Sequence, residues 1–162
     1  MSRVTIRHEN PADYEAITRI NDLAFEETAQ SRIIHELRDS GEALWSKVLL
    51  NDDKIIGHLM FYKILLDGAP IAAGLGPIAI HPDYQRRGYG GQLIRDGLAE
   101  VDPAQHQIIF LLGHTSYYPR FGFSSELGAQ YKSPWPRPAF MGLKLNEAAP
   151  TSGSLTFPKA YL

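Results

Sequence analysis

Three strand-like runs separated by two tight turns lie within residues 44–80, and they limit the possible folds more than any other feature of the sequence. The runs are residues 44–50, 54–66 and 69–80, all rich in apolar, β-branched or aromatic side chains. Asn51-Asp52-Asp53 separates the first two and Asp67-Gly68 the last two, and such residues form short hairpin turns. The segment is therefore predicted to fold as an antiparallel meander.

The rest of the chain is expected to add helices and further strands to this meander. In chain order we expect a strand at residues 3–8, a helix capped by Asn10, a second helix ending before Ser40-Gly41, the meander, a helix from about Gly88 to Val101, and a strand at 107–112. The last strand is continuously apolar, which is typical of a buried parallel strand. This order indicates an α/β (α+β) fold with helices on a mixed sheet. Residues 124–162 contain the strand-like run 140–145 and are expected to extend the same sheet.

Length and composition narrow the classes of protein. A chain of 162 residues fits one domain, so residues 1–162 are expected to form a single domain. A net charge of −2 argues against nucleic-acid binding, and the absence of cysteine excludes disulfides, thiolate zinc sites and an acyl-cysteine intermediate. No apolar run reaches the about 18 residues of a membrane span, and we expect a cytoplasmic protein. The six histidines show no metal-binding spacing, so no metal is expected.

A glycine-rich turn follows the third strand run and opens the next helix. Its residues are Gln85, Arg86, Arg87, Gly88, Tyr89, Gly90 and Gly91. Glycine leaves backbone amides uncovered, and amides at the positive end of a helix dipole bind phosphate groups. Arg86 and Arg87 add positive charge. The turn is predicted to hold a pyrophosphate, unless its glycines serve only to bend the chain. A Walker loop is excluded, because no Gly-Lys-Ser/Thr follows.

Two motifs resemble those of the GCN5-related N-acetyltransferases. Gln85-Arg86-Arg87-Gly88-Tyr89-Gly90 matches the acetyl-CoA loop of that family, Q/R-x-x-G-x-G/A, and Ile78-Ala79-Ile80-His81-Pro82 looks like the strand before it. Tyr117-Tyr118-Pro119-Arg120-Phe121-Gly122-Phe123 resembles the Tyr-x-x-x-Gly-Phe element of the family and the signature of one bacterial subfamily of predicted acetyltransferases. The resemblance implies the GNAT fold. That fold has a mixed, mostly antiparallel central sheet of about seven strands, splayed between strands 4 and 5 and flanked by helices on both faces.

The resemblance also implies an activity, the direct transfer of an acetyl group from acetyl-CoA to a primary amine. Backbone groups of Ile78, Ala79 and Ile80 would pair with the pantetheine arm, and the glycine-rich turn would hold the pyrophosphate. Tyr118 stands where the family carries the tyrosine that protonates the departing thiolate, and a phenol is protonated at neutral pH. The other interpretation of Tyr118 is a packing aromatic. Direct transfer agrees with the absence of cysteine.

The acceptor side of the site is less defined by the sequence. His114 follows the last apolar strand run and is either the base that takes a proton from the amine or a surface histidine. Glu26 and Glu27 lie between the first two helices, where the family often forms its acceptor pocket. They either bind a cationic amine or are solvated carboxylates. Gln30 and Thr115 depart from the glutamate and proline that are usual in the subfamily.

Three functions agree with these features. The leading one is acetylation of a small-molecule amine. The others are acetylation of a protein N-terminus or lysine, and a non-catalytic module that binds acyl-CoA. The expected partners are acetyl-CoA and an amine acceptor, with no nucleic acid and no membrane, and the protein is expected to be a monomer or a homodimer.

Overall fold

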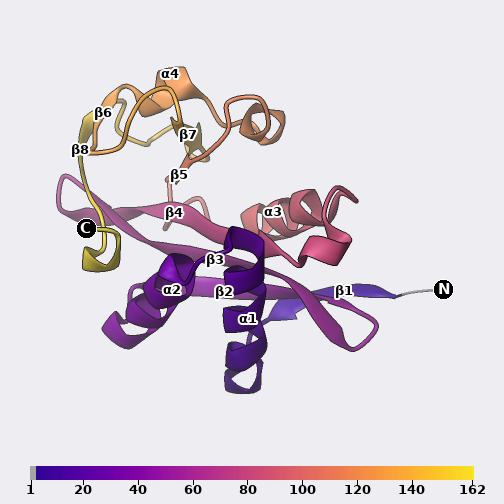
Figure 1. The fold of residues 1–162 in the computed structure, drawn as a ribbon. Helices are drawn as coiled ribbons and strands as arrows, with labels where there is room; N and C mark the ends of the chain where they lie inside the picture. Colours follow the sequence, from indigo (N-terminus) through magenta and orange to yellow (C-terminus); the bar gives the residue numbers. More distant parts are fainter. Residues whose placement is uncertain (1–2) are drawn as a thin grey trace. The chain divides into compact units, whose positions relative to one another are not determined.

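The computed structural model describes residues 3–162, which form a mixed sheet flanked by helices (Figure 1). The strands are β1 (Val4–His8), β2 (Ala43–Asn51), β3 (Lys54–Leu66), β4 (Ala69–Ile80), β5 (Ile108–Leu112), β6 (Tyr131–Lys132), β7 (Phe140–Lys144) and β8 (Gly153–Thr156). The α-helices are α1 (Tyr14–Phe25), α2 (Ala29–Ser40), α3 (Tyr89–Ala99) and α4 (Ser125–Gly128). The 3-10 helices are η1 (Pro11–Asp13), η2 (Pro82–Tyr84), η3 (Tyr118–Phe121) and η4 (Lys159–Tyr161). Hydrogen-bonded neighbours follow the order β1-β2-β3-β4-β5-β7, and β8 pairs with β3 and β6.

The chain forms two compact units that share strands β3 and β4. The first unit contains the residues up to Phe61 together with Gly76–Glu100, and the second contains Tyr62–Leu75 and Val101–Leu162. The first unit therefore includes β1, β2 and helices α1 to α3, and the second includes β5 to β8 and α4. The single domain expected over residues 1–162 stays a prediction. No helix within the described stretch has both the length and the apolar character that crossing a bilayer requires.

The predicted meander is confirmed, with nearly the expected bounds. β3 and β4 begin and end at the predicted residues, and β2 is one residue longer at each end than predicted. Asp52 and Asp67, in the two turns, have positive φ angles of 55° and 49°. Aspartate tolerates this conformation better than most residues do, so the turn chemistry fixes the lengths of the strands.

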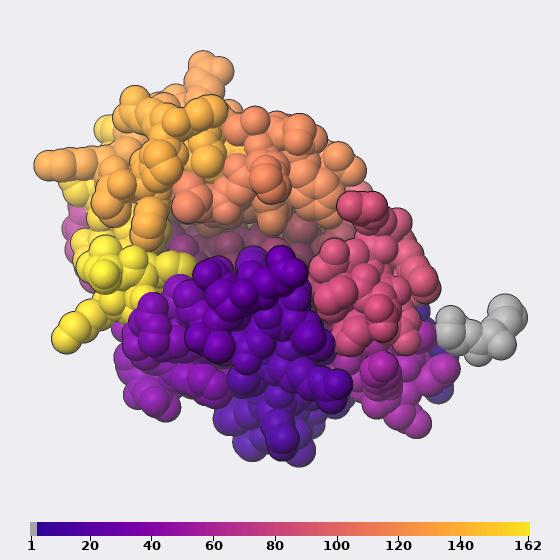
Figure 2. Space-filling model, in the orientation of Figure 1, coloured from indigo at the N-terminus to yellow at the C-terminus, as the bar shows by residue number. Residues whose placement is uncertain are grey.

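Two adjacent residues of β2 show that helices cover both faces of the sheet in the first unit. Successive strand residues point to opposite faces. Ser46 lies 2.8 Å from the buried ring of His58, which in turn contacts Asn21 of α1. Lys47 instead forms an ion pair of 2.7 Å with Asp96 of α3. The pair α1 and α2 therefore packs on one face and α3 on the other. Figure 2 shows the indigo and purple surface of α1 and α2 and the rose surface of α3.

The first helix begins later than the sequence predicted. Asn10 starts the 3-10 turn η1 instead of capping α1, and its backbone N–H donates to Oδ2 of Asp13 (2.8 Å). Arg7 of β1 donates to both carboxylate oxygens of Asp13 (2.7 and 3.1 Å), and these bonds lower the pKa of that carboxyl. Because Asp13 is held by both Arg7 and Asn10, the chain makes a tighter turn before α1 begins at Tyr14.

In the second unit, β5 is the buried parallel strand that its apolar sequence predicted. It pairs in parallel with β4 from Ala72 to Gly74, and the ladder stops where Gly74 meets Phe110. Along its whole length β5 pairs antiparallel with β7. The fully buried Phe110 stacks on Phe140 (5.3 Å between ring centroids) and meets Tyr131 edge-on (5.0 Å). An aromatic cluster therefore forms the core of this unit.

The tail extends the sheet, as predicted. Strand β7 lies beside β5, and β8 pairs with the end of β3 through Leu65 with Thr156 and Leu66 with Leu155. The described residues contain eight strands, whereas the resemblance implied about seven. The difference comes from β6 and β8, which have only two and four residues and pair with each other in parallel.

Candidate functional site

The glycine-rich turn is built against the end of β4. The backbone N–H of His81 donates to the carbonyl of Ile56 (2.8 Å), and its Nδ1 accepts from the backbone N–H of Asp83 (3.1 Å). The Nε2 of Gln85 donates to the carbonyl of Ile80 (2.9 Å). These bonds fold η2 and the following turn back toward the strand, so the chain takes a defined path before α3 begins.

The first turn of α3 presents backbone donors suited to an anion. Gly88 is its N-cap, with a φ of 85° that glycine adopts without strain. No side chain caps this helix, and the backbone N–H of Gln92 donates to the carbonyl of Gly88 (3.2 Å). The preceding amides, those of Tyr89, Gly90 and Gly91, therefore have no acceptor within the helix and lie at the positive end of its dipole. This arrangement can hold a phosphate group.

Exposed cations stand beside these donors. Arg86 and Arg87 are exposed, and neither forms an ion pair with a carboxylate of residues 3–162. The guanidinium of Arg87 lies 5.4 Å from the ring centroid of Tyr84, and Nζ of Lys54 lies 5.8 Å from it. Tyr84 and Lys54 lie outside the sequence motifs that predicted the site. The signal was present, however, because Lys54 begins the strand expected to run antiparallel to the one that ends at Ile80.

The residues expected to contact the pantetheine arm form the end of β4. Ala79 is buried, whereas Ile78 and Ile80 are partly exposed. The side chain of Ile80 lies against Gly57 of β3, where a Cβ would approach its Cδ1 to 2.9 Å. Glycine at position 57 thus lets this end of β4 pack closely on β3.

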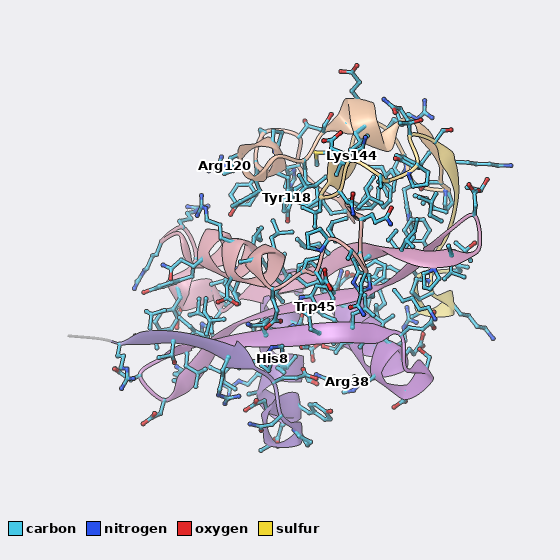
Figure 3. The ribbon with its side chains drawn as sticks, turned by 180° about the vertical axis from the view of Figure 1, so that it is seen from behind. His8, Arg38, Trp45, Tyr118, Arg120 and Lys144 are labelled. Carbon is cyan, nitrogen blue, oxygen red and sulfur yellow. The ribbon has the colours of Figure 1, made fainter. Side chains whose placement is uncertain are left out.

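Tyr118 begins η3 in the second unit (Figure 3). Its ring meets Tyr117 edge-on (5.1 Å between centroids) and Phe123 in the same way (6.3 Å). A Cβ on Gly113 would come within 2.3 Å of the Tyr118 ring, so glycine at that position makes room for it. Gly122, with a φ of 100°, ends η3, which explains the spacing of the Tyr-x-x-x-Gly motif. Burial raises the pKa of the Tyr118 hydroxyl, with a smaller contribution from Tyr117, so the phenol is protonated at neutral pH.

The same turn carries an arginine that sequence analysis left without a role. Nε of Arg120 donates to the carbonyl of Tyr117 (2.8 Å), and its guanidinium lies 4.4 Å from the Tyr117 ring centroid. Figure 3 shows Arg120 and Tyr118 on this one turn. A positive charge is therefore fixed next to the tyrosine pair.

His114 takes part in the structure of this turn through its backbone. Its carbonyl accepts the N–H groups of Tyr117 (3.1 Å) and Tyr118 (3.3 Å). Its side chain is exposed, as is that of the neighbouring Thr115. Both interpretations of the His114 ring, base and surface group, agree with this position.

The acidic pair and the neighbouring glutamine lie where α1 meets α2. Glu26 ends α1 with a φ of 55°, and both Glu26 and Glu27 are exposed without an ion pair among the described residues. Gln30 lies in the first turn of α2, and its Oε1 is buried without a hydrogen-bond partner. Gln30 as a whole is half-buried, so an uncharged amide oxygen is shielded from solvent at this position.

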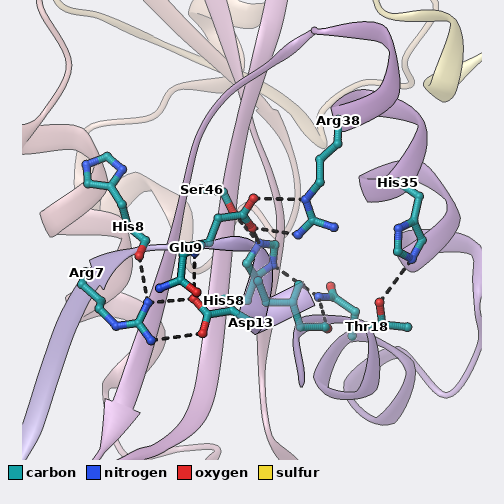
Figure 4. Close-up of polar contacts among 12 residues, drawn as sticks. Arg7, His8, Glu9, Asp13, Thr18, His35, Arg38, Ser46 and His58 are labelled. Carbon is teal, nitrogen blue, oxygen red and sulfur yellow. Dashed lines mark hydrogen bonds and ion pairs between the residues drawn. The ribbon is translucent and has the colours of Figure 1, made fainter. Parts of the chain in front are cut away.

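A buried polar network in the first unit was not predicted as a whole (Figure 4). His58 of β3 is fully buried and contacts Ser46 (2.8 Å) and Asn21 (3.3 Å). Oγ of Ser46 donates to Glu9 (2.6 Å), which accepts two bonds from Arg38 (2.7 and 3.1 Å). Burial, and next the charge of Arg38, lower the pKa of His58 to about 3, so its ring is neutral.

The predicted site residues fall into two sets. The glycine-rich turn, the end of β4 and the glutamate pair belong to the first unit, whereas His114 and Tyr118 belong to the second. Within residues 3–162 there is no group of three or more His, Cys, Asp or Glu side chains that could hold a metal ion. The chemistry that the described residues offer is anion binding by the first set and proton donation by the second.

Comparison with known proteins finds the same fold in acetyltransferases. A family model described as an acetyltransferase (GNAT) domain matches residues 5–125. The uncharacterized N-acetyltransferase YjhQ of Escherichia coli K12 is 31% identical over 140 residues, which cover 83% of this chain and 77% of that protein. The crystal structure of a GNAT family acetyltransferase from Brucella melitensis in complex with acetyl-CoA has a TM-score of 0.85 at 30% identity, covering 99% of both chains. That of YhbS from E. coli in complex with CoA has a TM-score of 0.90 at 25% identity, covering 99% of this chain and 93% of the other.

The family match includes both motifs that carried the resemblance, the turn that opens α3 and the tyrosine element of η3. It also covers well over half of the 162 residues. Together with the solved relatives, it shows that this chain belongs to the GNAT family of acetyltransferases.

Proposed function

We propose that the protein is an acetyl-CoA-dependent N-acetyltransferase that acts on a primary amine of a small molecule. The observation that carries the proposal is the anion-binding start of α3. Three amides there lack an acceptor within the helix, and the two arginines beside them form no ion pair with a carboxylate of the described residues. Two relatives hold acetyl-CoA or CoA in their crystal structures. A cytoplasmic location is part of the same proposal.

In this proposal the first unit holds the cofactor. The amides of residues 89–91 bind the pyrophosphate, and the positive charges of Arg86 and Arg87 offset its negative charge. Gln85 keeps the turn folded through its bond to Ile80. The backbone of residues 78–80 pairs with the pantetheine arm. Acetyl-CoA, when bound, supplies the acetyl group as a thioester.

Tyr118 is the proposed general acid. As the neutral amine nitrogen bonds to the acetyl carbon, the carbon–sulfur bond breaks and the departing sulfur takes the phenolic proton. The nitrogen releases its extra proton to solvent as the amide forms, and solvent returns a proton to Tyr118. Burial raises the pKa of Tyr118, so the hydroxyl is protonated at neutral pH and has a proton to donate. His114 is the proposed base that removes a proton from the incoming ammonium group, and Glu26 and Glu27 are proposed to attract that cation.

Cofactor binding is the first test. Purified protein is titrated calorimetrically with acetyl-CoA, and one binding event per chain is expected. Absence of binding up to millimolar concentration, in protein that circular dichroism shows to be folded, would overturn the proposal.

The catalytic role of Tyr118 is tested with a panel of amines and detection of the released thiol. Tyr118→Phe should keep the acetyl-CoA affinity but lower kcat about 100-fold or more, as expected for the loss of a general acid. An unchanged kcat would assign Tyr118 to packing. The panel includes peptides with a free N-terminus and with lysine, and turnover of these alone would replace the small-molecule acceptor with a protein.

A further inference from the structure

Two positively charged side chains from separate parts of the chain lie near the ring of Tyr84, beside the glycine-rich turn. Nζ of Lys54, at the start of β3, lies 5.8 Å from the ring centroid, and the guanidinium carbon of Arg87 lies 5.4 Å from it. Both distances are within the roughly 6 Å over which an aromatic face attracts a cation. His81 packs edge-on against the same ring (5.8 Å between centroids) and is itself bonded to β3 through Ile56. Tyr84 is therefore the aromatic residue that both cations approach.

Neither cation has a carboxylate partner in the described part of the chain. No ion pair within residues 3–162 includes Lys54 or Arg87, and both side chains are exposed. The carboxylates nearest in sequence are Asp53 and Asp83, and that of Asp83 lies 3.9 Å from Nδ1 of His81. Two like charges, each within about 6 Å of one ring centroid, repel each other, and an anion that contacts both would offset this repulsion.

We infer that Lys54 and Arg87 bind the 3′-phosphate on the ribose of coenzyme A, with Tyr84 as their positioning residue. This inference rests on the proposed function. The amides at the start of α3 already provide for the pyrophosphate, whereas the 3′-phosphate is a monoester that carries a charge of about −1.5 to −2 at neutral pH. A guanidinium and an ammonium group are the side chains that bind such a group. The protein therefore distinguishes coenzyme A from its 3′-dephospho form.

The test compares two ligands that differ only in this phosphate. CoA and dephospho-CoA are titrated calorimetrically into the wild type and into the double variant Lys54→Gln/Arg87→Gln. The wild type should bind CoA at least about tenfold more tightly than dephospho-CoA, the ratio expected for a charge-assisted contact. The double variant should lose most of this preference for CoA, because its affinity for CoA should fall several-fold more than its affinity for dephospho-CoA, which Arg87 contacts only through the pyrophosphate charge.

A matched control separates a local contact from general charge loss. Lys63→Gln/Arg19→Gln removes two cations that are also exposed and without ion pairs in the described region, and it should leave both affinities within about twofold. Tyr84→Leu should reduce the CoA preference, whereas Tyr84→Phe, which keeps the ring, should retain it.

The remaining outcomes overturn the inference in distinguishable ways. Equal losses for both ligands in the Lys54/Arg87 variant would assign these cations to the pyrophosphate. Unchanged affinities would show that they bind no phosphate. A wild type that binds neither ligand would overturn the proposed function itself, whereas binding without a preference for CoA would leave that function standing and reject only the 3′-phosphate contact.

Discussion

The backbone at Gly88 is the single-residue feature on which the cofactor site depends. Its φ is 85°, and a Cβ there would meet no atom within 4 Å, so alanine would bring strain without a clash. Gly88→Ala should therefore lower the free energy of unfolding by about 1 kcal/mol and weaken CoA binding, because the chain relieves the strain by moving the amides. Urea denaturation and calorimetric titration measure the two effects.

Gly68 provides the matched control for that experiment. It has a similar φ of 82° and equally open surroundings, but it lies in the turn between β3 and β4. Gly68→Ala should lower the free energy of unfolding by a similar amount while leaving the CoA affinity unchanged. Equal losses of affinity in both variants would mean that global stability, and not the local path of the turn, controls binding.

His58 links the stability of the protein to pH. Its pKa falls from 6.5 to about 3 on folding, so the unfolded chain binds a proton more tightly than the folded one. Its contribution to the free energy of unfolding is therefore complete above about pH 6.5 and is lost as the pH falls toward 3, by up to about 1.4 kcal/mol per pH unit.

The variant His58→Gln tests this directly. Glutamine can donate to Ser46 and accept from Asn21 but does not titrate. The difference in free energy of unfolding between the wild type and this variant should change in favour of the variant as the pH is lowered from 7 to 4. A difference that stays constant over this range would show that the His58 ring does not remain neutral in the folded protein.

At the scale of an element, the packing of α3 depends on Gly97. Alanine is normally better than glycine inside a helix by up to about 1 kcal/mol. Here a Cβ would come within 2.7 Å of Cε2 of Phe61, and that ring is fully buried and stacked on Trp45 at 4.7 Å. Gly97→Ala should therefore destabilise the protein by about 1–3 kcal/mol in urea denaturation. A stabilising effect would mean that α3 can move away from β3 at little cost.

Elements with local signals were predictable from the sequence, and those that depend on distant partners were not. β3 and β4 were predicted to the residue because Asp52-Asp53 and Asp67-Gly68 are turn formers that mark the ends of the strands. β6 and β8 were missed because they have two and four residues and exist through pairing with each other and with β3. The late start of α1 was missed because it depends on Arg7, which reaches Asp13 from β1.

The candidate site also contains parts with a local sequence signal and parts that depend on distant residues. The turn from Gln85 to Gly91 was found because its chemistry lies in consecutive residues. The group formed by Lys54, Tyr84 and Arg87 was missed, because it needs the register of β3 against β4 as well as the sequence. The roles of Tyr118 and His114 stay predictions that the enzyme assays will decide.

At the scale of the whole molecule, the two units should unfold together. β3 and β4 each contribute residues to both units, so the backbone of these two strands is continuous from one unit into the other. The two tryptophans report on one unit each, Trp45 on the first and Trp135 on the second. In Trp45→Phe and in Trp135→Phe, the fluorescence of the remaining tryptophan should change at the same urea concentration as the far-ultraviolet circular dichroism.

The fluorescence and circular dichroism midpoints are compared within the same variant. Any change in stability caused by the substitution therefore affects both midpoints equally. Coincident transitions in both variants would establish residues 1–162 as a single cooperative domain. A fluorescence midpoint that differs from the circular dichroism midpoint by more than the fitting error would instead mean that the units unfold as separate domains.

The neighbours Ser46 and Lys47 have a consequence for how β2 finds its place in the sheet. A shift of one residue would turn the lysine ammonium toward His58 and Arg38, inside a buried region that already contains positive charge, and would leave Asp96 facing a serine. The apolar residues alone would make such a shift cost little free energy. Val48, Leu49 and Leu50 are consecutive and all buried, so apolar side chains occupy both faces of the strand in either register. The hydroxyl of Ser46 and the ammonium group of Lys47, on opposite faces of β2, thus make any pairing of β2 that is shifted by one residue less stable than the native register.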